Sequence, residues 1–294
     1  MSDIKLVDSW NRSLGETELC DYLTSLGAEI ETNVRGVIPN YEIDILVKGQ
    51  NLLVEYNGIY WHSTKFKDKN YHKKKADLAE ELGYQLIQVW EDDWAHSQKR
   101  KILESKFAHL LGCSGSSSIY GRLTTISKIP YSEASEFLNL YHLQGERTGS
   151  EYIGLFFDGS LVAVMVLLKK KQAITIARYA SSSQVLGGFS KLLAYVKKVY
   201  DWDQIVTYAD RTISTGDLYH KTGFMLERIT PPGLWYVKGN NRYRREAFMK
   251  HKLPLLFQSV DLSKTEEEIM SENGYRTLFD AGLMKFVMYN QSDK

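Results

Sequence analysis

Two acidic residues lie where a short hairpin would place them face to face. If Gly49-Gln50 forms a two-residue loop, with glycine at the first central position as a type II′ turn requires, then Asp44 lies opposite Glu55. Like charges directly across a strand pair are destabilising, so this arrangement predicts a cation between the carboxylates. Mg²⁺ is the expected ion, because it is a hard cation that takes oxygen ligands.

An amide and an imidazole follow the acidic pair. Asn57 shares the strand face of Glu55, and His62 lies just beyond the strand. Hydrolysis of a phosphodiester needs an activated water and neutralised charge at phosphorus, which a metal and a base can provide. His62 suits the role of base, because an imidazole titrates near neutral pH. The structural alternative is a solvated acidic hairpin beside a packed Trp61 and a histidine whose hydrogen bonds are satisfied.

The hairpin needs neighbouring elements to hold it. Ser13 and Glu16 have the spacing of a capping box, and apolar residues at helical spacing follow, which predicts an amphipathic helix over residues 14–26. Glu18 sits at the edge of the apolar face of this helix and can point toward whatever the helix packs on. The downstream pattern predicts a helix, a strand and a second helix over residues 71–82, 84–90 and 97–111.

This region resembles a known class of nucleases. Asp44, the run Tyr56-Asn57-Gly58-Ile59-Tyr60-Trp61-His62 and the later Gly83-Tyr84 and Trp90-Glu91 are similar to the very short patch repair (Vsr) endonucleases and their phage homing relatives. Those enzymes belong to the PD-(D/E)XK class. The resemblance spans roughly residues 13 to 111 and implies a restriction-endonuclease-like fold.

The resemblance also implies a role for each matched residue. Asp44 takes the place of the metal-binding aspartate, His62 that of the catalytic histidine, and Glu18 that of the helical glutamate. The backbone carbonyl of Tyr56 is implied as a metal ligand beside the Glu55 carboxylate.

Asn57 departs from the family pattern. In the PD-(D/E)XK pattern this position is a lysine, and in the repair enzymes it is often a histidine. An amide can donate a hydrogen bond to a phosphate oxygen but supplies no positive charge. The helix that follows offers His72 and one of Lys73, Lys74 or Lys75 as substitutes.

A small-residue cluster divides the chain. Residues 112–118 have the composition of a flexible linker, which predicts a nuclease domain over 1–111 and a second domain over 119–294. The pattern of the second domain predicts a mixed α/β fold. Its strands and helices are expected near residues 132–141, 152–157, 160–168, 172–179, 188–200 and 204–208.

The second domain resembles the GCN5-related acetyltransferases. Tyr219-His220-Lys221-Thr222-Gly223-Phe224 is similar to their last helix and following strand, and Gln184-Val185-Leu186-Gly187-Gly188-Phe189 is similar to their pyrophosphate loop. Phe189 stands where that loop needs a small residue for close approach to the phosphates. We therefore expect an acetyltransferase-like fold without coenzyme A binding.

Cations of the second domain are candidates for contact with DNA. Arg242, Arg244 and Arg245 belong to a run of cations interleaved with aromatic residues, a composition that suits phosphate contacts. The two-part layout resembles phage homing endonucleases that join a nuclease to such a domain, and Arg211 lies in a segment that echoes them. Lys74 adds a cation in the first domain. The alternative for the run is a solvated charged surface.

Overall composition limits the function classes. The chain has 294 residues, a net charge of +1 and two cysteines without metal-binding spacing, which argues against a structural zinc site and for a reducing cytoplasm, bacterial or phage-infected. No apolar run reaches bilayer length, so no membrane association is expected. Local patches must bind any polyanion.

The sequence therefore predicts a Mg²⁺-dependent DNA endonuclease of the homing type, with the second domain contributing DNA recognition. One alternative is an acetyltransferase or base-modifying enzyme that acts through the second domain. The other is a DNA-binding protein without catalysis. Oligomeric state and target sequence are not encoded in any recognisable pattern.

Overall fold

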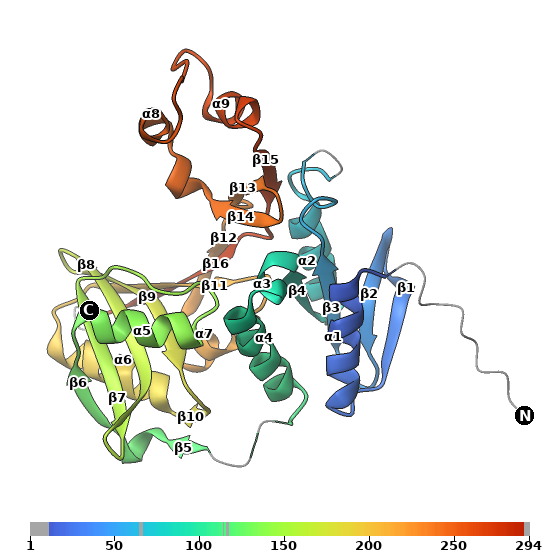
Figure 1. Ribbon diagram of the computed structural model, residues 1–294. Coiled ribbons are helices and arrows are strands. Elements are labelled where there is room, and N and C mark those ends of the chain that lie inside the picture. The colour runs from blue at the N-terminus through green and yellow to red at the C-terminus, as the bar shows by residue number, and fades with distance from the viewer. Residues whose placement is uncertain (1–11, 65–66, 114, 116–117, 291–294) are drawn as a thin grey trace, which may run out of the picture. The chain divides into compact units, whose positions relative to one another are not determined.

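The computed structural model describes residues 12–64, 67–113, 115 and 118–290 (Figure 1). The chain forms two compact units. The first comprises residues up to Arg100, Phe107–Cys113 and Pro232–Ala281, and the second comprises Lys101–Lys106, Ser114–Pro231 and the residues from Gly282 onward. Residues 232–281 thus group with the first unit, although the sequence placed them in a single domain over 119–294. Part of the expected linker, at positions 114, 116 and 117, lies outside the described residues.

The first unit is built on a four-stranded mixed sheet in the order β1-β2-β3-β4. β1 and β2 pair antiparallel, as do β2 and β3, whereas β3 and β4 are parallel. The helix between β3 and β4 makes the crossover that a parallel pair needs. The bounds are α1 Leu14–Ser25, β1 Ile30–Ile38, β2 Tyr41–Val47, β3 Leu52–Asn57, α2 Tyr71–Glu81, β4 Gln85–Trp90, α3 Glu91–Ala95 and α4 Ser97–Leu110.

The register of the β2–β3 hairpin agrees with the sequence prediction. Val47 pairs with Leu52 and Ile45 with Val54, so Gly49-Gln50 are the two central loop residues. Gly49 has φ +71°, a conformation that glycine adopts readily, and the Gln50 backbone N–H donates to the Val47 carbonyl at 3.4 Å. Strand β1 was not expected. It is an edge strand with only two buried residues, so its hydrophobic alternation is weak.

Helices α1 and α2 cover opposite faces of this sheet. Tyr56 points toward α1, because a Cβ placed on Gly15 would lie only 2.0 Å from the Tyr56 hydroxyl. The preceding residue, Glu55, points to the other face and meets Lys75 of α2. The acidic hairpin therefore turns its carboxylates toward α2.

Residues 232–281 form a small sheet of their own that packs within the first unit. Its strand order is β14-β13-β15, and Val237 and Leu278 share a core with Ile59 and Trp90. The bounds are β13 Leu234–Lys238, β14 Asn241–Arg244, η2 Arg245–Phe248, η3 Lys250–Lys252, α8 Leu253–Leu256, α9 Glu266–Glu272 and β15 Arg276–Phe279.

The second unit is built on a seven-stranded sheet in the order β12-β16-β11-β9-β8-β7-β6. β9 and β11 are parallel neighbours, but they pair with each other only from Ala173↔Gln204 to Ile176↔Thr207. Beyond that point each strand continues and pairs with its other neighbour, β8 or β16. The bounds are β5 Ile119–Tyr120, η1 Gly121–Leu123, β6 Thr125–Lys128, α5 Tyr131–Tyr141, β7 Glu151–Phe157, β8 Ser160–Lys170, β9 Ala173–Ser181, β10 Val185–Leu186, α6 Gly188–Val199, β11 Gln204–Asp210, α7 Asp217–Lys221, β12 Met225–Ile229 and β16 Leu283–Tyr289.

Both units combine helices with sheets, so the fold is mixed α/β, as the sequence predicted. Within the described part of the chain, every helix is too short or too polar to cross a membrane.

Candidate functional site

Asp44 and Glu55 meet at the end of the β2–β3 ladder. The register places them opposite each other, one position beyond the Ile45–Val54 pair. The Asp44 backbone N–H donates to Glu55 Oε1 at 3.3 Å, and the Tyr56 backbone N–H donates to Asp44 Oδ2 at 2.7 Å. The side chains therefore replace the backbone ladder here and hold two carboxylates close together.

Burial makes these carboxylates costly to ionise. Burial raises the pKa of Glu55 to about 8, and the neighbouring Asp44 charge adds to the shift. Burial also raises the pKa of Asp44, although the hydrogen bond from Tyr56 and the Lys75 charge oppose it. A positive charge between the two groups would favour their ionised forms, which is the electrostatic condition for a cation site.

Lys75 brings a buried ammonium to this pair. Its Nζ lies 2.5 Å from Glu55 Oε1 and donates to the Glu42 carbonyl at 2.6 Å, with only 2% of the residue exposed. Lys73 instead pairs with Asp77 on the helix surface. Of the three lysines that the sequence offered on this helix, Lys75 is the one that α2 directs at the carboxylates.

Two imidazoles form a hydrogen-bonded chain beside the carboxylates. His62 Nδ1 lies 3.2 Å from His72 Nε2, and His72 Nδ1 lies 2.9 Å from Gln88 Oε1. If His72 donates to Gln88, its Nε2 must accept from His62, and His62 Nε2 is left as a free acceptor. Burial lowers the pKa of His62 to about 2 and that of His72 to about 3, so both rings are neutral at physiological pH.

The amide chain behind the histidines includes a residue that the sequence analysis missed. Asn57 Nδ2 donates to Gln88 Oε1 at 3.3 Å, so Asn57 faces the histidine chain instead of holding a charge. Asn57 and Gln88 are both buried, and Asn57 Oδ1 and Gln88 Nε2 have no hydrogen-bond partner among the residues that the structure describes. The available signal was Gln88 itself, a polar residue in the middle of a strand that is otherwise buried.

The structure places Glu16, in addition to the selected Glu18, near the site. Burial and the Asp44 charge raise the pKa of Glu16 to about 7. Glu18 has other partners: its Oε2 accepts from Arg100 Nη1 at 2.5 Å and from Trp94 Nε1 at 3.3 Å. Glu16 is thus the helical glutamate whose charge is coupled to Asp44.

Most of the expected DNA-binding cations have partners within the protein. Arg242 Nε lies 2.8 Å from Asp92 Oδ1 and its Nη2 lies 2.7 Å from Asp93 Oδ2, with a side chain that is only 4% exposed. Arg245 pairs with a glutamate of α9 at 2.8 Å, and Arg211 is buried in the second unit. Arg244 is half-buried with its guanidinium 5.6 Å from the centre of the Trp235 ring, whereas the side chains of Lys74 and Arg245 are more than half exposed. The sequence therefore overestimated the free charge of this run.

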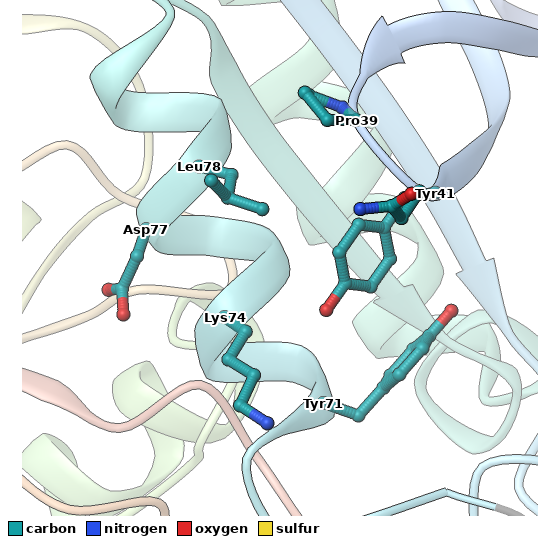
Figure 2. A pocket seen from close by; sticks show the side chains of 7 residues that line it. Pro39, Tyr41, Tyr71, Lys74, Asp77 and Leu78 are labelled. Atoms are coloured by element: carbon teal, nitrogen blue, oxygen red, sulfur yellow. The ribbon is translucent and has the colours of Figure 1, made fainter.

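A hollow of about 610 Å³ lies between the turn at residues 39–41 and helix α2. Figure 2 shows Tyr41 from the start of β2 next to Tyr71 and Lys74 from α2. The hollow is lined by Pro39, Asn40, Tyr41, Tyr71, Lys74, Asp77 and Leu78.

The donor atoms near Asp44 suit a hard cation in part. Asp44, Glu55 and the Tyr56 carbonyl would offer oxygen ligands, as Mg²⁺ prefers. Among the described residues, no three His, Cys, Asp or Glu side chains are arranged to hold a metal ion. A Mg²⁺ ion here would therefore rely on these few protein ligands, with water and phosphate oxygens completing its coordination, as is usual for this ion.

The loop before α6 does not fit a coenzyme pyrophosphate. Gly187 has φ +73° and caps the N-terminus of α6. A Cβ on Gly121 would lie 2.9 Å from the Gly187 carbonyl carbon, so η1 packs directly on this turn. Lys191 Nζ also donates to the Gly121 carbonyl at 2.9 Å. Phe189 is buried, with its ring 5.1 Å from that of Tyr179.

No family model matches the chain, and no curated protein matches it. An IAA acetyltransferase from Bacillus cereus is 19% identical, with a TM-score of 0.35, over 57% of this chain and 99% of its own. A Bacillus subtilis acetyltransferase is 17% identical, with a TM-score of 0.33, over 57% of this chain and 99% of its own. The catalytic domain of the homing endonuclease I-Bth0305I is 23% identical, with a TM-score of 0.29, over 34% of this chain and 98% of its own.

Acetyltransferases are more numerous among these structures, and those two cover more of the chain than the endonuclease domain does. All three matches have low identity and a low TM-score, so we base the proposed activity on the geometry of the site.

We expect His62 and His72 to stay neutral well below the usual titration range. Their side-chain nitrogen shifts, assigned with single His→Gln variants, should not move between about pH 8 and pH 5. In the urea-unfolded chain the same groups should titrate near pH 6.5, about the value of a free histidine. Since only the unfolded chain then takes up protons, the free energy of unfolding should fall as the pH drops below that value. Titration near 6.5 in the folded protein would contradict the buried histidine chain.

Arg242→Ala should lower the stability of the first unit. Removal of the guanidinium takes a cation from the buried Asp92 carboxylate and leaves Asp93 with Lys99, and the loss of a buried pair costs about 3–5 kcal/mol. Urea unfolding measures the loss, with Arg244→Ala as the neighbouring control at a half-buried position over the Trp235 ring, where about 1 kcal/mol or less is expected. Equal stability of the two variants would show that the Arg242 pair is not structural.

Proposed function

We propose that the first unit is a metal-dependent endonuclease that hydrolyses phosphodiester bonds in DNA. The observation that carries this proposal is the convergence of Asp44, Glu55 and Lys75, which places two buried carboxylates and an ammonium at one point. A restriction-endonuclease-like site of the Vsr type fits this set. The arrangement lies where the β2–β3 ladder ends, and the hollow between residues 39–41 and α2 is an open surface that an extended polymer could reach.

Each group has a distinct role in this proposal. Asp44, Glu55 and the Tyr56 carbonyl would hold Mg²⁺, which when bound neutralises charge on a phosphate and lowers the pKa of water. Lys75 binds an oxygen of the phosphate by its positive charge, the role that a strand lysine has in the family pattern. The buried position of Lys75 strengthens that interaction, because it is poorly screened by water.

His62 is the proposed base. Its Nδ1 is engaged by His72, which leaves Nε2 as the atom that can accept a proton from water. The low pKa of His62 in the free protein keeps it neutral. An anionic phosphate beside the ring would raise that pKa in the complex, because negative charge favours the imidazolium.

A homing type of endonuclease is the finer form of the proposal. It rests on the sequence resemblance to phage homing enzymes and on the presence of a second unit that could contribute DNA contacts. Lys74 and Arg245 are the exposed cations among the expected DNA-binding residues of the first unit.

Asp44→Asn should abolish plasmid cleavage in Mg²⁺ while DNA binding is largely retained. The change removes a charge from the metal site without changing its size. Asp21→Asn, at an exposed position on α1, is the matched control and should cut at the wild-type rate. A chelator of divalent cations should stop plasmid cleavage by the wild-type protein. Undiminished cutting by Asp44→Asn would refute the proposed active site.

An acetyltransferase is the second candidate. The observation in its favour is the parallel β9–β11 pair. The pairing stops at Ile176↔Thr207 while both strands continue, so the sheet opens between these two interior strands. The loop before α6 argues against it, because η1 packs on the turn where a coenzyme pyrophosphate would need the backbone amides.

Calorimetry with acetyl-coenzyme A separates the two candidates. We expect no heat of binding to the wild-type chain, since Gly121 lies against the Gly187–Gly188 peptide and Phe189 fills the position of a small residue. The same injections into a known acetyltransferase provide the positive control. Saturable binding to this chain would favour the second candidate.

A further inference from the structure

We propose that the hollow beside α2 holds the nucleoside next to the phosphate that is cleaved, with the base packed on Tyr41 and Tyr71. This inference rests on the proposed endonuclease function. It assigns a ligand to the surface formed by the start of β2 and the first turns of α2 (Figure 2). The ligand class is a nucleotide within a DNA strand.

The floor of the hollow is aromatic. The rings of Tyr41 and Tyr71 lie 5.4 Å apart at 56°, and neither side chain is fully buried. An aromatic surface of this kind offers stacking to a base without demanding a particular sequence, because every base has a π face. Leu78 and Pro39 add apolar walls.

The same two tyrosines border the carboxylate pair. Lys75 Nζ lies 5.7 Å from the centre of the Tyr41 ring while it contacts Glu55. Burial raises the pKa of the Tyr71 hydroxyl, and the charges of Glu55 and Asp44 add to that shift. The hollow and the proposed cleavage site therefore share a wall, as successive nucleotides of one strand require.

Charge around the hollow suits a phosphate-linked ligand. Lys74 lines it and is exposed, and its Nζ lies 3.7 Å from Asp68 Oδ1. The acidic lining residue, Asp77, is neutralised by Lys73 at 2.6 Å. Lys67 Nζ also lies 4.1 Å from the centre of the Tyr71 ring, so a second cation stands at the edge of the aromatic floor. The volume of about 610 Å³ falls within the range of small-molecule sites.

Photochemical cross-linking tests the inference without knowledge of the target sequence. The probe is a mixed-sequence DNA duplex that contains 5-iododeoxyuridine, bound to the full-length Asp44→Asn protein so that it is not cut. Irradiation should attach the base to Tyr41 or Tyr71, and peptide mass spectrometry identifies the residue. Cross-links confined to other positions would overturn the assignment.

Binding measurements provide the second arm. Tyr41→Leu should weaken duplex binding by about tenfold, the scale of one lost stacking contact, whereas Tyr41→Phe should bind as wild type. Tyr289→Leu is the control for an exposed tyrosine of the second unit, and thermal unfolding verifies that each variant is folded. Unchanged binding by Tyr41→Leu in a protein that still cuts DNA would refute the nucleoside site in the hollow but not the proposed endonuclease activity. A wild-type protein that neither binds nor cuts DNA would refute both this inference and the proposed function.

Discussion

The arrangement of the first unit depends on the buried contact between the Glu55 carboxylate and the Lys75 ammonium. Desolvation of two charges is expensive, and removal of one partner would leave the other uncompensated. Apolar packing of Ala76 and Ala79 with Leu53 also joins α2 to β3, but apolar contacts are not directional. The ion pair adds a directional constraint on the rotation of α2, in the orientation in which His72, one turn before Lys75, reaches Gln88 and His62. The same helix face thus serves both the carboxylates and the imidazoles.

The sequence was sufficient for the parts of this site that depend on local patterns. The glycine at position 49 set the hairpin loop, and the period of two then placed Asp44 opposite Glu55. The helix over 71–81 was predicted to within one residue at its end, because Gly83 stops it. Lys75 could also have been selected, since it lies at helical spacing from the buried His72 and Ala79 and is therefore a lysine on an apolar face.

The sequence failed where partners come from distant segments. Glu16 was given a capping role, and Ser13 Oγ does accept from the Glu16 backbone N–H at 3.2 Å. The pKa of its carboxyl is nevertheless raised, by burial and by the Asp44 charge, which the sequence did not indicate. Arg242 was read as a free cation because the run around it is polar, yet its partners, Asp92 and Asp93, lie about 150 residues earlier. Local composition cannot reveal such pairs, since ladder pairing and packing decide them.

Asn57 and Lys75 together replace the single strand lysine of the family pattern. A lysine at position 57 would share the strand face of Glu55 and could bring its charge to the carboxylates directly. Asn57 is instead bonded to Gln88, the same amide oxygen that His72 contacts, so a long cation there would break the chain that orients the histidines. Helix α2, which covers the sheet face that Glu55 points to, supplies the positive charge through Lys75. The strand is thereby left free to fix the imidazoles, and the site keeps both an ammonium and an oriented base without placing them on the same element.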